Sequence, residues 1–182
     1  MAQTDPADPA RTSPATPILA LRSGLLALAR TGWPPQSAAL GPLVTETFDL
    51  SGITASVLGP AAATATPEQA TRFAQAFGQR MARELTRSRP DPEADRFAIQ
   101  EIRSIGPTEW LVITRHELPA GTPGSPVVLG WRVRALPDGP RIVDLLRDGV
   151  SAVQVQRDDI AAALRTRPLD ALLADIERRA AR

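Results

Sequence analysis

The order of hydrophobic patterns along this 182-residue chain predicts an α+β fold, with helices packed on a highly curved four-stranded antiparallel sheet that encloses an apolar cavity. Three observations support this prediction. Apolar residues recur at helical spacing over residues 18–87, alternate over 96–147, and return to helical spacing after 151. Because helices and strands occupy separate stretches, the pattern is typical of α+β domains and not of alternating βαβ units.

The first half of the chain is expected to be helical. Residues 1–16 hold three prolines among small polar residues, and we expect a disordered N-terminal tail before a single domain over residues 17–182. Further helices are predicted around residues 18–29, 36–48 and 50–58, the last capped by Asp49 or Ser51.

The clearest helix start is Thr66-Pro67-Glu68-Gln69. Thr66 can cap the helix, Pro67 suits its first position, and Gln69 completes a capping box. The helix should run to about Arg87, with Phe73 and Phe77 on its apolar stripe.

Four consecutive strands should follow. The turn at Pro137–Pro140, between two apolar alternating runs, predicts a β-hairpin, and Gly149-Val150-Ser151 should end the last strand and cap a helix. The strands are expected at 96–103, 109–116, 127–135 and 141–147, with helices at about 151–164 and 168–180.

Composition excludes several classes of function. The net charge is +1, without the clustered basic excess of a nucleic-acid-binding protein. Cysteine is absent, so no disulfide, thiol nucleophile or thiolate metal site is possible. No apolar run reaches 18 residues, and Arg22 interrupts the run from Ile18 to Ala29, so we expect a buried first helix there and no signal peptide in the chain.

No residue pattern indicates an enzyme, and we expect no catalytic residues, no metal and no cofactor. The single histidine, His116, ends a strand and would need a partner such as Asp144 for acid–base work. Asp158 and Asp159 point in different directions on a helix, which makes them poor joint metal ligands. The glycine-rich phosphate motifs and the common hydrolase and zinc-peptidase motifs are absent.

The functional signal lies in apolar faces. One face of each strand and the stripe of the helix that begins at Pro67 could either pack as an ordinary core or stand apart around an apolar ligand. We expect them to stand apart, with a dry hollow between the sheet and the Phe73/Phe77 stripe. The residues expected to contact the ligand are Leu50, Val57, Phe73, Phe77, Met81, Phe97, Ile99, Trp110, Val112, Leu129, Trp131, Val133, Val143, Leu145, Val150 and Val153.

Several short phrases occur in a recognisable order and spacing. They are Phe48-Asp49-Leu50, Leu58-Gly59, Thr66–Gln69 leading into Phe73 and Phe77, Trp131-Arg132-Val133, Arg141–Asp144, Gly149-Val150-Ser151 and Leu169–Leu172. Together these phrases resemble the MlaC family of periplasmic phospholipid-binding proteins, also known as toluene-tolerance or ABC-transporter auxiliary proteins. The resemblance covers about residues 17–178, and the chain departs from the family pattern at Ala61–Ala63, at Pro140 and at Trp131-Arg132.

The resemblance implies a fold similar to nuclear-transport-factor-like domains and a lipid carrier in the periplasm of a Gram-negative bacterium. Such a carrier would hold phospholipid acyl tails inside and shuttle them between an inner-membrane ABC transporter complex and an outer-membrane lipoprotein complex, which would support outer-membrane lipid asymmetry. We expect a monomer that binds no nucleic acid, with Arg132 and Arg134 either solvated or in contact with headgroups or partners.

Three alternatives stay open at this point. A relative of this kind could carry a hopanoid or another polycyclic lipid. A small isomerase-like enzyme could use a similar cone-shaped fold, with Asp144 or His116 inside the cavity. A non-catalytic interaction module would have a solid core instead.

Overall fold

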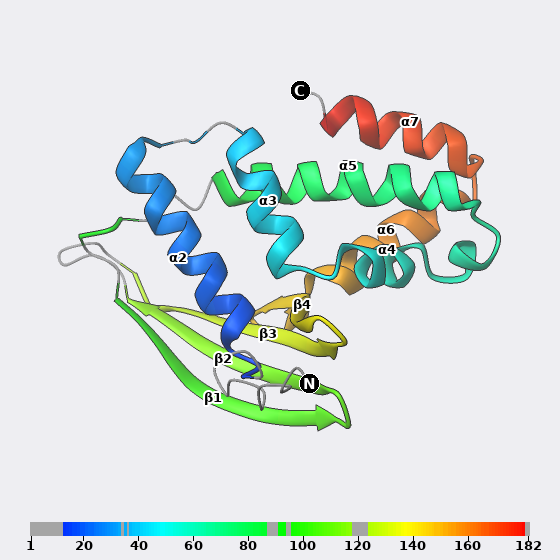
Figure 1. The fold of residues 1–182 in the computed structure, drawn as a ribbon. Helices are drawn as coiled ribbons and strands as arrows, with labels where there is room; N and C mark the ends of the chain where they lie inside the picture. Colours follow the sequence, from blue (N-terminus) through cyan, green and yellow to red (C-terminus); the bar gives the residue numbers. More distant parts are fainter. Residues whose placement is uncertain are drawn as a thin grey trace, which may run out of the picture.

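The computed structural model describes residues 13–33, 35, 37–86, 91–93, 96–117 and 124–180 (Figure 1). Most of the predicted N-terminal tail lies outside these residues. The elements are α2 (Thr16–Thr31), α3 (Ser37–Thr47), α4 (Leu50–Leu58), the short 3-10 helix η1 (Gly59–Ala63), α5 (Pro67–Thr86), β1 (Arg96–Gly106), β2 (Glu109–Glu117), β3 (Val127–Leu136), β4 (Gly139–Arg147), β5 (Val150–Ser151), α6 (Ala152–Leu164) and α7 (Leu169–Ala180).

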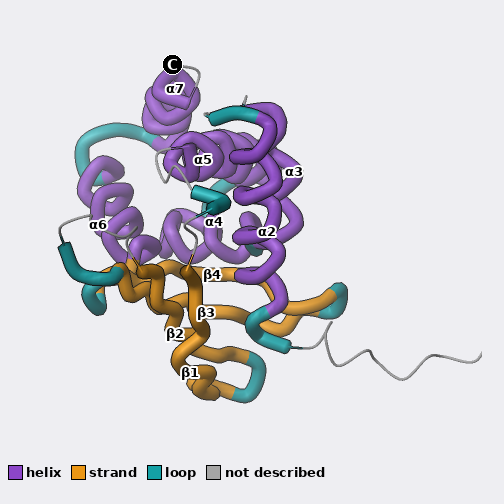
Figure 2. The backbone as a smooth tube through the Cα atoms, turned by 90° about the vertical axis from the view of Figure 1, so that its left-hand side faces the viewer, coloured by secondary structure: helices purple, strands orange, loops and turns teal. Residues whose placement is uncertain are grey.

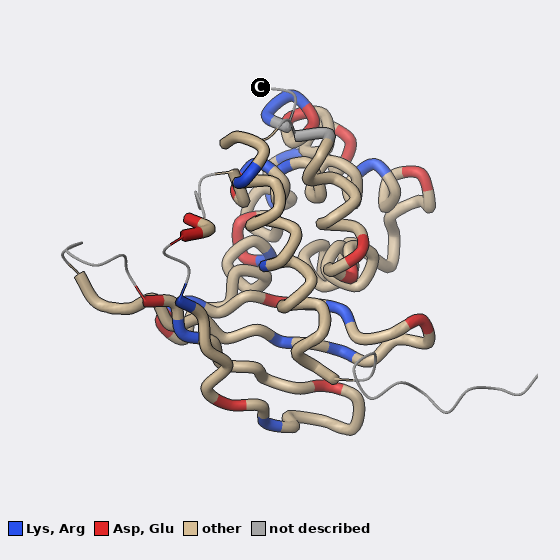
Figure 3. The backbone as a smooth tube through the Cα atoms, turned by 60° about the vertical axis from the view of Figure 1, so that its left-hand side comes forward, with Lys and Arg blue, Asp and Glu red and all other residues tan. Residues whose placement is uncertain are grey.

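The helices gather on one side of a curled, open sheet (Figures 1 and 2). Helices α2, α3, α4 and α6 contact β4 and form the tier next to the sheet. Helix α5 crosses above α3 and α4, and α7 packs against α5 on the side away from the sheet. Acidic and basic residues are interspersed over both layers in the view of Figure 3. The predicted α+β class with a helical layer on a curved antiparallel sheet is confirmed.

The sheet is an antiparallel meander in the order β1-β2-β3-β4-β5. The predicted hairpin forms between β3 and β4, where Leu136 pairs with Gly139 and leaves Pro137 and Asp138 as a two-residue turn. The pairing of β1 with β2 shifts register at Ile99/Glu101 and again at Ser104/Gly106. Irregularities of this kind bend a strand and strengthen the twist of a sheet.

A fifth strand corrects the expected number of four. Asp148 and Gly149 have φ of 53° and 78°, and this left-handed pair reverses the chain so that Val150 and Ser151 pair with the end of β4. A two-residue strand is too short to produce a periodic pattern, which is why the sequence did not predict it.

Side chains cap the helices as the sequence predicts. Asp49 accepts a hydrogen bond from the amide of Gly52 at 2.8 Å and begins α4. The capping box of α5 is reciprocal: the Gln69 amide donates to Thr66 Oγ1 at 3.1 Å, and the Thr66 amide donates to Gln69 Oε1 at 2.9 Å. Ser151 caps α6 by accepting from the amide of Gln154.

The core extends from the sheet through the first tier of helices to α5 and α7, whose Phe73 and Leu173 are buried in the same cluster. Phe48 bridges Ile142 at the edge of β4, which fixes the junction of α3 and α4 against the sheet. Inside the core, Trp131 donates its indole N–H to Thr114 Oγ1 at 2.8 Å, so both buried polar groups are satisfied.

Candidate ligand-binding site

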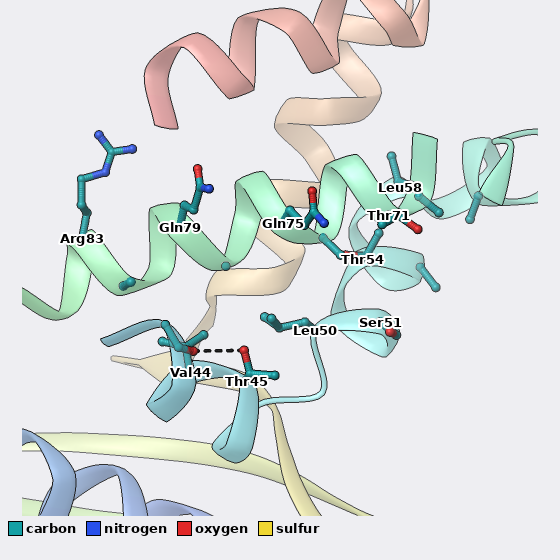
Figure 4. A pocket seen from close by; sticks show the side chains of 17 residues that line it. Val44, Thr45, Leu50, Ser51, Thr54, Leu58, Thr71, Gln75, Gln79 and Arg83 are labelled. Atoms are coloured by element: carbon teal, nitrogen blue, oxygen red, sulfur yellow. Dashed lines mark hydrogen bonds between the residues drawn. The ribbon is translucent and has the colours of Figure 1, made fainter. Parts of the chain in front are cut away.

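A cavity of about 1190 Å³ lies among the helices, between α5 and the facing α3, α4 and η1 (Figure 4). Its volume exceeds the roughly 300–1,000 Å³ of ordinary small-molecule pockets. Its walls are formed by Gly41, Val44, Thr45, Leu50, Ser51, Thr54, Ala55, Leu58, Ala62, Ala70, Thr71, Ala74, Gln75, Gly78, Gln79, Ala82 and Arg83.

The cavity exists because small residues face each other across it. Residues four apart form a ridge along a helix. Helix α5 presents the ridge Ala70-Ala74-Gly78-Ala82 to the cavity. On the facing wall, Gly41, Ser51, Ala55 and Ala62 are equally small. The missing side-chain volume on both walls leaves a hollow while the helices stay at packing distance elsewhere.

The next ridge of α5 is polar and forms one edge of the cavity. It consists of Thr71, Gln75, Gln79 and Arg83, again four residues apart, and Figure 4 shows the last three side chains extending from the same flank of the helix. Thr71 Oγ1 donates to the carbonyl of Pro67 at 2.8 Å, which leaves it little freedom to bind anything else. The remaining three carry donors of the kinds that bind phosphate and ester oxygens.

One buried hydroxyl on the cavity wall also lacks a partner. Thr54 in α4 is 4% exposed, and its Oγ1 makes no hydrogen bond with any residue that the structure describes. By contrast, the hydroxyl of buried Thr47 in α3 donates to the carbonyl of Leu43 at 2.7 Å.

The flank of α5 next to this small ridge packs into the core. Phe73 and Phe77 stack with ring centroids 6.1 Å apart, and both are buried in one cluster with Val112 and Val133 of the sheet. The expected hollow lies between the Phe73/Phe77 stripe and the sheet, whereas this cavity lies along the neighbouring ridge of the same helix, between α5 and the facing helices.

The residues predicted to contact a ligand divide into groups. Leu50 is the member that lines the large cavity. Val143 and Val153 line a separate polar pocket of about 140 Å³, Trp110 is half-buried on β2, and Val150 is 58% exposed. The others lie in or against the core cluster, and their role as ligand contacts stays a prediction: Val57, Phe73, Phe77, Met81, Phe97, Ile99, Val112, Leu129, Trp131, Val133 and Leu145.

Sequence reasoning missed most of the cavity wall because it followed large apolar residues. A signal was present: three alanines and a glycine recur every four residues in α5, next to the phenylalanine stripe. Alanine is also an ordinary helix former, so the ridge does not stand out in a hydrophobic pattern until the facing helix is known to be small as well.

The polar pocket belongs to an ion-pair network on β2, β3 and β4. Glu109 accepts hydrogen bonds from both Arg132 and Arg134 at 2.8 Å. The hydrogen bond from Arg132 is the largest cause that lowers the pKa of Glu109, against the opposing effect of burial, and the bond from Arg134 adds to it. The two arginines, expected to be solvated or in contact with headgroups or partners, thus both pair with Glu109 within the protein.

Asp144 and His116, the two candidate acid–base residues, do not come together, and neither lines the large cavity. Asp144 lies opposite Arg132 in the sheet, whereas His116 shares its face with Val112, which lies opposite Trp131. Because Trp131 and Arg132 are neighbours in one strand, Asp144 and His116 lie on opposite faces. Asp144 instead accepts hydrogen bonds from the Ser151 hydroxyl and the Val153 amide, which hold the start of α6.

Over the described ranges, no group of three potential metal ligands gathers in one place. Among the helices in those same ranges, none has the length and apolar character needed to cross a bilayer.

Fold and cavity together define an α+β protein whose helical layer encloses an elongated hollow beside a curled sheet. The family model described as MlaC protein matches residues 35–178, which is most of the chain, and the chain therefore belongs to the MlaC family. No curated protein matched the chain.

A solved structure has the same fold. It is a phospholipid-binding protein from Ralstonia solanacearum, determined in complex with a phospholipid. The two chains share 19% sequence identity and superpose with a TM-score of 0.74, covering 93% of this chain and 98% of the other.

Proposed function

We propose that this protein is a periplasmic lipid carrier that holds phospholipid acyl tails in the cavity between α3, α4 and α5. In this proposal it shuttles the lipid between an inner-membrane ABC transporter complex and an outer-membrane lipoprotein complex, and it catalyses no reaction. The observation that carries the proposal is the size and shape of the cavity, and membership of the MlaC family supports it.

The length of the cavity suits an acyl tail. Its wall on α5 extends from Ala70 to Arg83. At 1.5 Å per helical residue this span is about 20 Å. A tail in a membrane occupies one leaflet, which is half of a hydrocarbon core of roughly 30 Å. The cavity is thus long enough for an extended tail, whereas the typical drug-sized pocket is compact.

Energetics favour a carrier that needs a docked partner for release. Burial of acyl chain contributes about 0.8 kcal/mol per methylene. Two long tails would gain more than ~20 kcal/mol before costs are subtracted, which is near the limit of non-covalent binding. Because a bilayer offers the tails a similar gain, transfer between two apolar environments can be nearly neutral while escape into water is very slow.

The fold relationship adds a second line of support. The Ralstonia solanacearum protein that shares the fold was determined with a phospholipid bound, so this architecture can accommodate such a ligand. A hopanoid or another polycyclic lipid would satisfy the apolar walls as well, and the test below distinguishes the two.

Native mass spectrometry of the purified protein, followed by solvent extraction and lipid analysis, tests the proposal. We expect a co-purified glycerophospholipid at up to one molecule per protein. A polycyclic lipid in its place would change the ligand class, and protein that stays lipid-free after incubation with phospholipid vesicles would overturn the proposal.

A further inference from the structure

We propose that Arg83, supported by Gln79 and Gln75, binds the phosphodiester of the carried lipid, so that the headgroup lies at the C-terminal end of α5 and the tails run toward η1. This inference rests on the proposed function, because it assigns a polar subsite within the same cavity. In this inference Arg83 binds the phosphate of the lipid, whereas the apolar walls of the cavity contact only the acyl tails.

The two ends of the cavity differ in chemistry. At one end the wall is formed by Leu58, Ala62, Ala70 and Thr71, and the only side-chain polar group of these four, the Thr71 hydroxyl, already donates to the carbonyl of Pro67. At the other end stands Arg83, in the last turns of α5. An amphipathic ligand in a cavity with one apolar end and one cationic end has a single favoured orientation.

Arg83 is available for an anion. Within the residues that the structure describes, no ion pair or side-chain hydrogen bond is formed by its guanidinium, although Arg72 and Arg80 on the same helix both have partners. Arg72 pairs with Glu177 of α7 at 2.9 Å, and Arg80 donates to Gln156 of α6. Of these three arginines of α5, Arg83 is therefore the one whose guanidinium is unpaired among the described residues, and it lies on the cavity wall.

The spacing of the polar ridge fits a glycerophospholipid. Gln79 and Gln75 follow Arg83 at intervals of four residues, about 6 Å each along the helix axis, on the same flank. A guanidinium can hold two phosphate oxygens at once, and an amide N–H₂ can donate to an ester carbonyl. The ridge therefore presents a phosphate-binding group first and ester-binding groups next, in the order in which a phospholipid carries them.

A competition experiment tests this assignment. Purified protein is incubated with vesicles of phosphatidylcholine and diacylglycerol that carry identical tails, and the ratio of the two lipids on the protein is measured by native mass spectrometry. Phosphatidylcholine has the phosphate but no net charge, so general attraction to an anionic surface does not contribute. Comparing variants in the same vesicles cancels the different tendencies of the two lipids to leave the bilayer.

Arg83→Gln should lower the bound ratio of phosphatidylcholine to diacylglycerol about tenfold, as expected for losing a charge-assisted hydrogen bond. The matched control is Arg80→Gln, which makes the same change of charge on the same helix away from the cavity wall and should leave the ratio unchanged. Equal ratios for Arg83→Gln and the unmodified protein, or equal losses in both variants, would overturn the inference.

Two further measurements on the unmodified protein test the inference without any substitution. The ratio for the unmodified protein should fall as salt is raised, because a half-buried cation on a cavity edge is screened. Glycerophosphocholine, which keeps the phosphodiester without tails, should not bind measurably; saturable binding as tight as that of the lipid would overturn the assignment to a lipid headgroup. Absence of both lipids from the protein would instead contradict the proposed function itself.

Discussion

At the scale of single residues, the sequence shows how many charged side chains there are, but it does not show which of them form ion pairs with each other. Arg132 and Arg134 stand on one face of a predicted strand, and their partner Glu109 lies on the neighbouring strand, 23 and 25 residues away. Pairing required the register of β2 against β3, in which Glu109 lies opposite Arg134. Register depends on the hydrophobic face and on the conformation of the connecting loop together, and the alternating pattern alone does not say which charged residues lie opposite each other.

Replacement of Glu109 by glutamine should make the stability of the protein less sensitive to acid. The pKa of Glu109 is lowered from its ordinary value of 4.5, so its charged form stabilises the fold at neutral pH and this contribution is lost as pH falls through the lowered pKa. We expect Glu109→Gln to cost roughly 1–2 kcal/mol at pH 7 in urea denaturation, with the difference shrinking below pH ~4.

The control for this change is Glu101→Gln. Glu101 lies 3.7 Å from Arg103 in an exposed pair, and such pairs contribute about 0–1 kcal/mol at most. A constant difference between Glu109→Gln and the unmodified protein across the acid range would contradict the assigned pairing.

The Thr54 hydroxyl offers a second residue-level prediction. Because it is buried without a partner among the described residues, Thr54→Val removes an unsatisfied polar group and keeps the shape of the side chain. We expect the free energy of unfolding to rise by about 1 kcal/mol, measured by urea denaturation of lipid-free protein. Thr47→Val, which removes a satisfied hydroxyl, should give no such gain, and a loss of stability in Thr54→Val would show that this hydroxyl is bonded.

At the scale of elements, helix α5 shows what a sequence reveals and what it hides. Its start at the Thr66 capping box, its length and its phenylalanine stripe were predicted and are confirmed. The face that lines the cavity was not predicted, because the small residues Ala70, Ala74, Gly78 and Ala82 contribute little to a hydrophobic pattern. A hydrophobic pattern reports which side chains are large and buried; it does not report volume that two helices jointly leave empty.

Filling the small ridge should block the ligand while the fold is kept. Ala74 lies in the middle of the ridge, and Ala74→Phe would place a ring in the cavity while Phe73 and Phe77 on the neighbouring ridge stay unchanged. We expect the amount of co-purified lipid to fall at least severalfold, measured by lipid extraction, while the far-ultraviolet circular dichroism spectrum is unchanged.

Ala171→Phe serves as the matched control, because Ala171 is exposed on α7 and away from the cavity wall. Full lipid occupancy in Ala74→Phe would place the tails elsewhere, and the core residues predicted first, such as Trp131 and Val133, would then be the next to test.

At the scale of the whole molecule, the order of elements and the fold class followed from the sequence. The change from helical to alternating spacing located the sheet, and the Pro137–Pro140 turn located one hairpin within it. The position of the cavity did not follow, since a packed core and a lipid cavity use the same residue types. Only the arrangement of α3, α4 and α5 in space separates Phe73, which is buried in the core, from Ala74, which faces the hollow.

Ligand removal should lower the stability of the whole protein. A ligand that binds only the folded state stabilises it by RT ln(1 + [L]/Kd), so a tightly held lipid at a hundred times its Kd contributes about 2.7 kcal/mol. We expect the Tm to fall by several degrees after delipidation and to recover when phospholipid is added back, measured by differential scanning calorimetry. An unchanged Tm in protein whose lipid content has been shown to fall would mean that the tails do not occupy the folded interior.

The two facing rows of alanine, glycine and serine have a consequence for how such a protein could change its cargo. The hollow comes from absent methyl and methylene groups on helices that otherwise pack normally. Each wall position therefore limits the length of the cavity at its own depth. A single Ala→Val exchange near Ala70 would shorten the space for the acyl tail by about one helical turn without moving any backbone. Selection for shorter or longer fatty acids could thus proceed one side chain at a time.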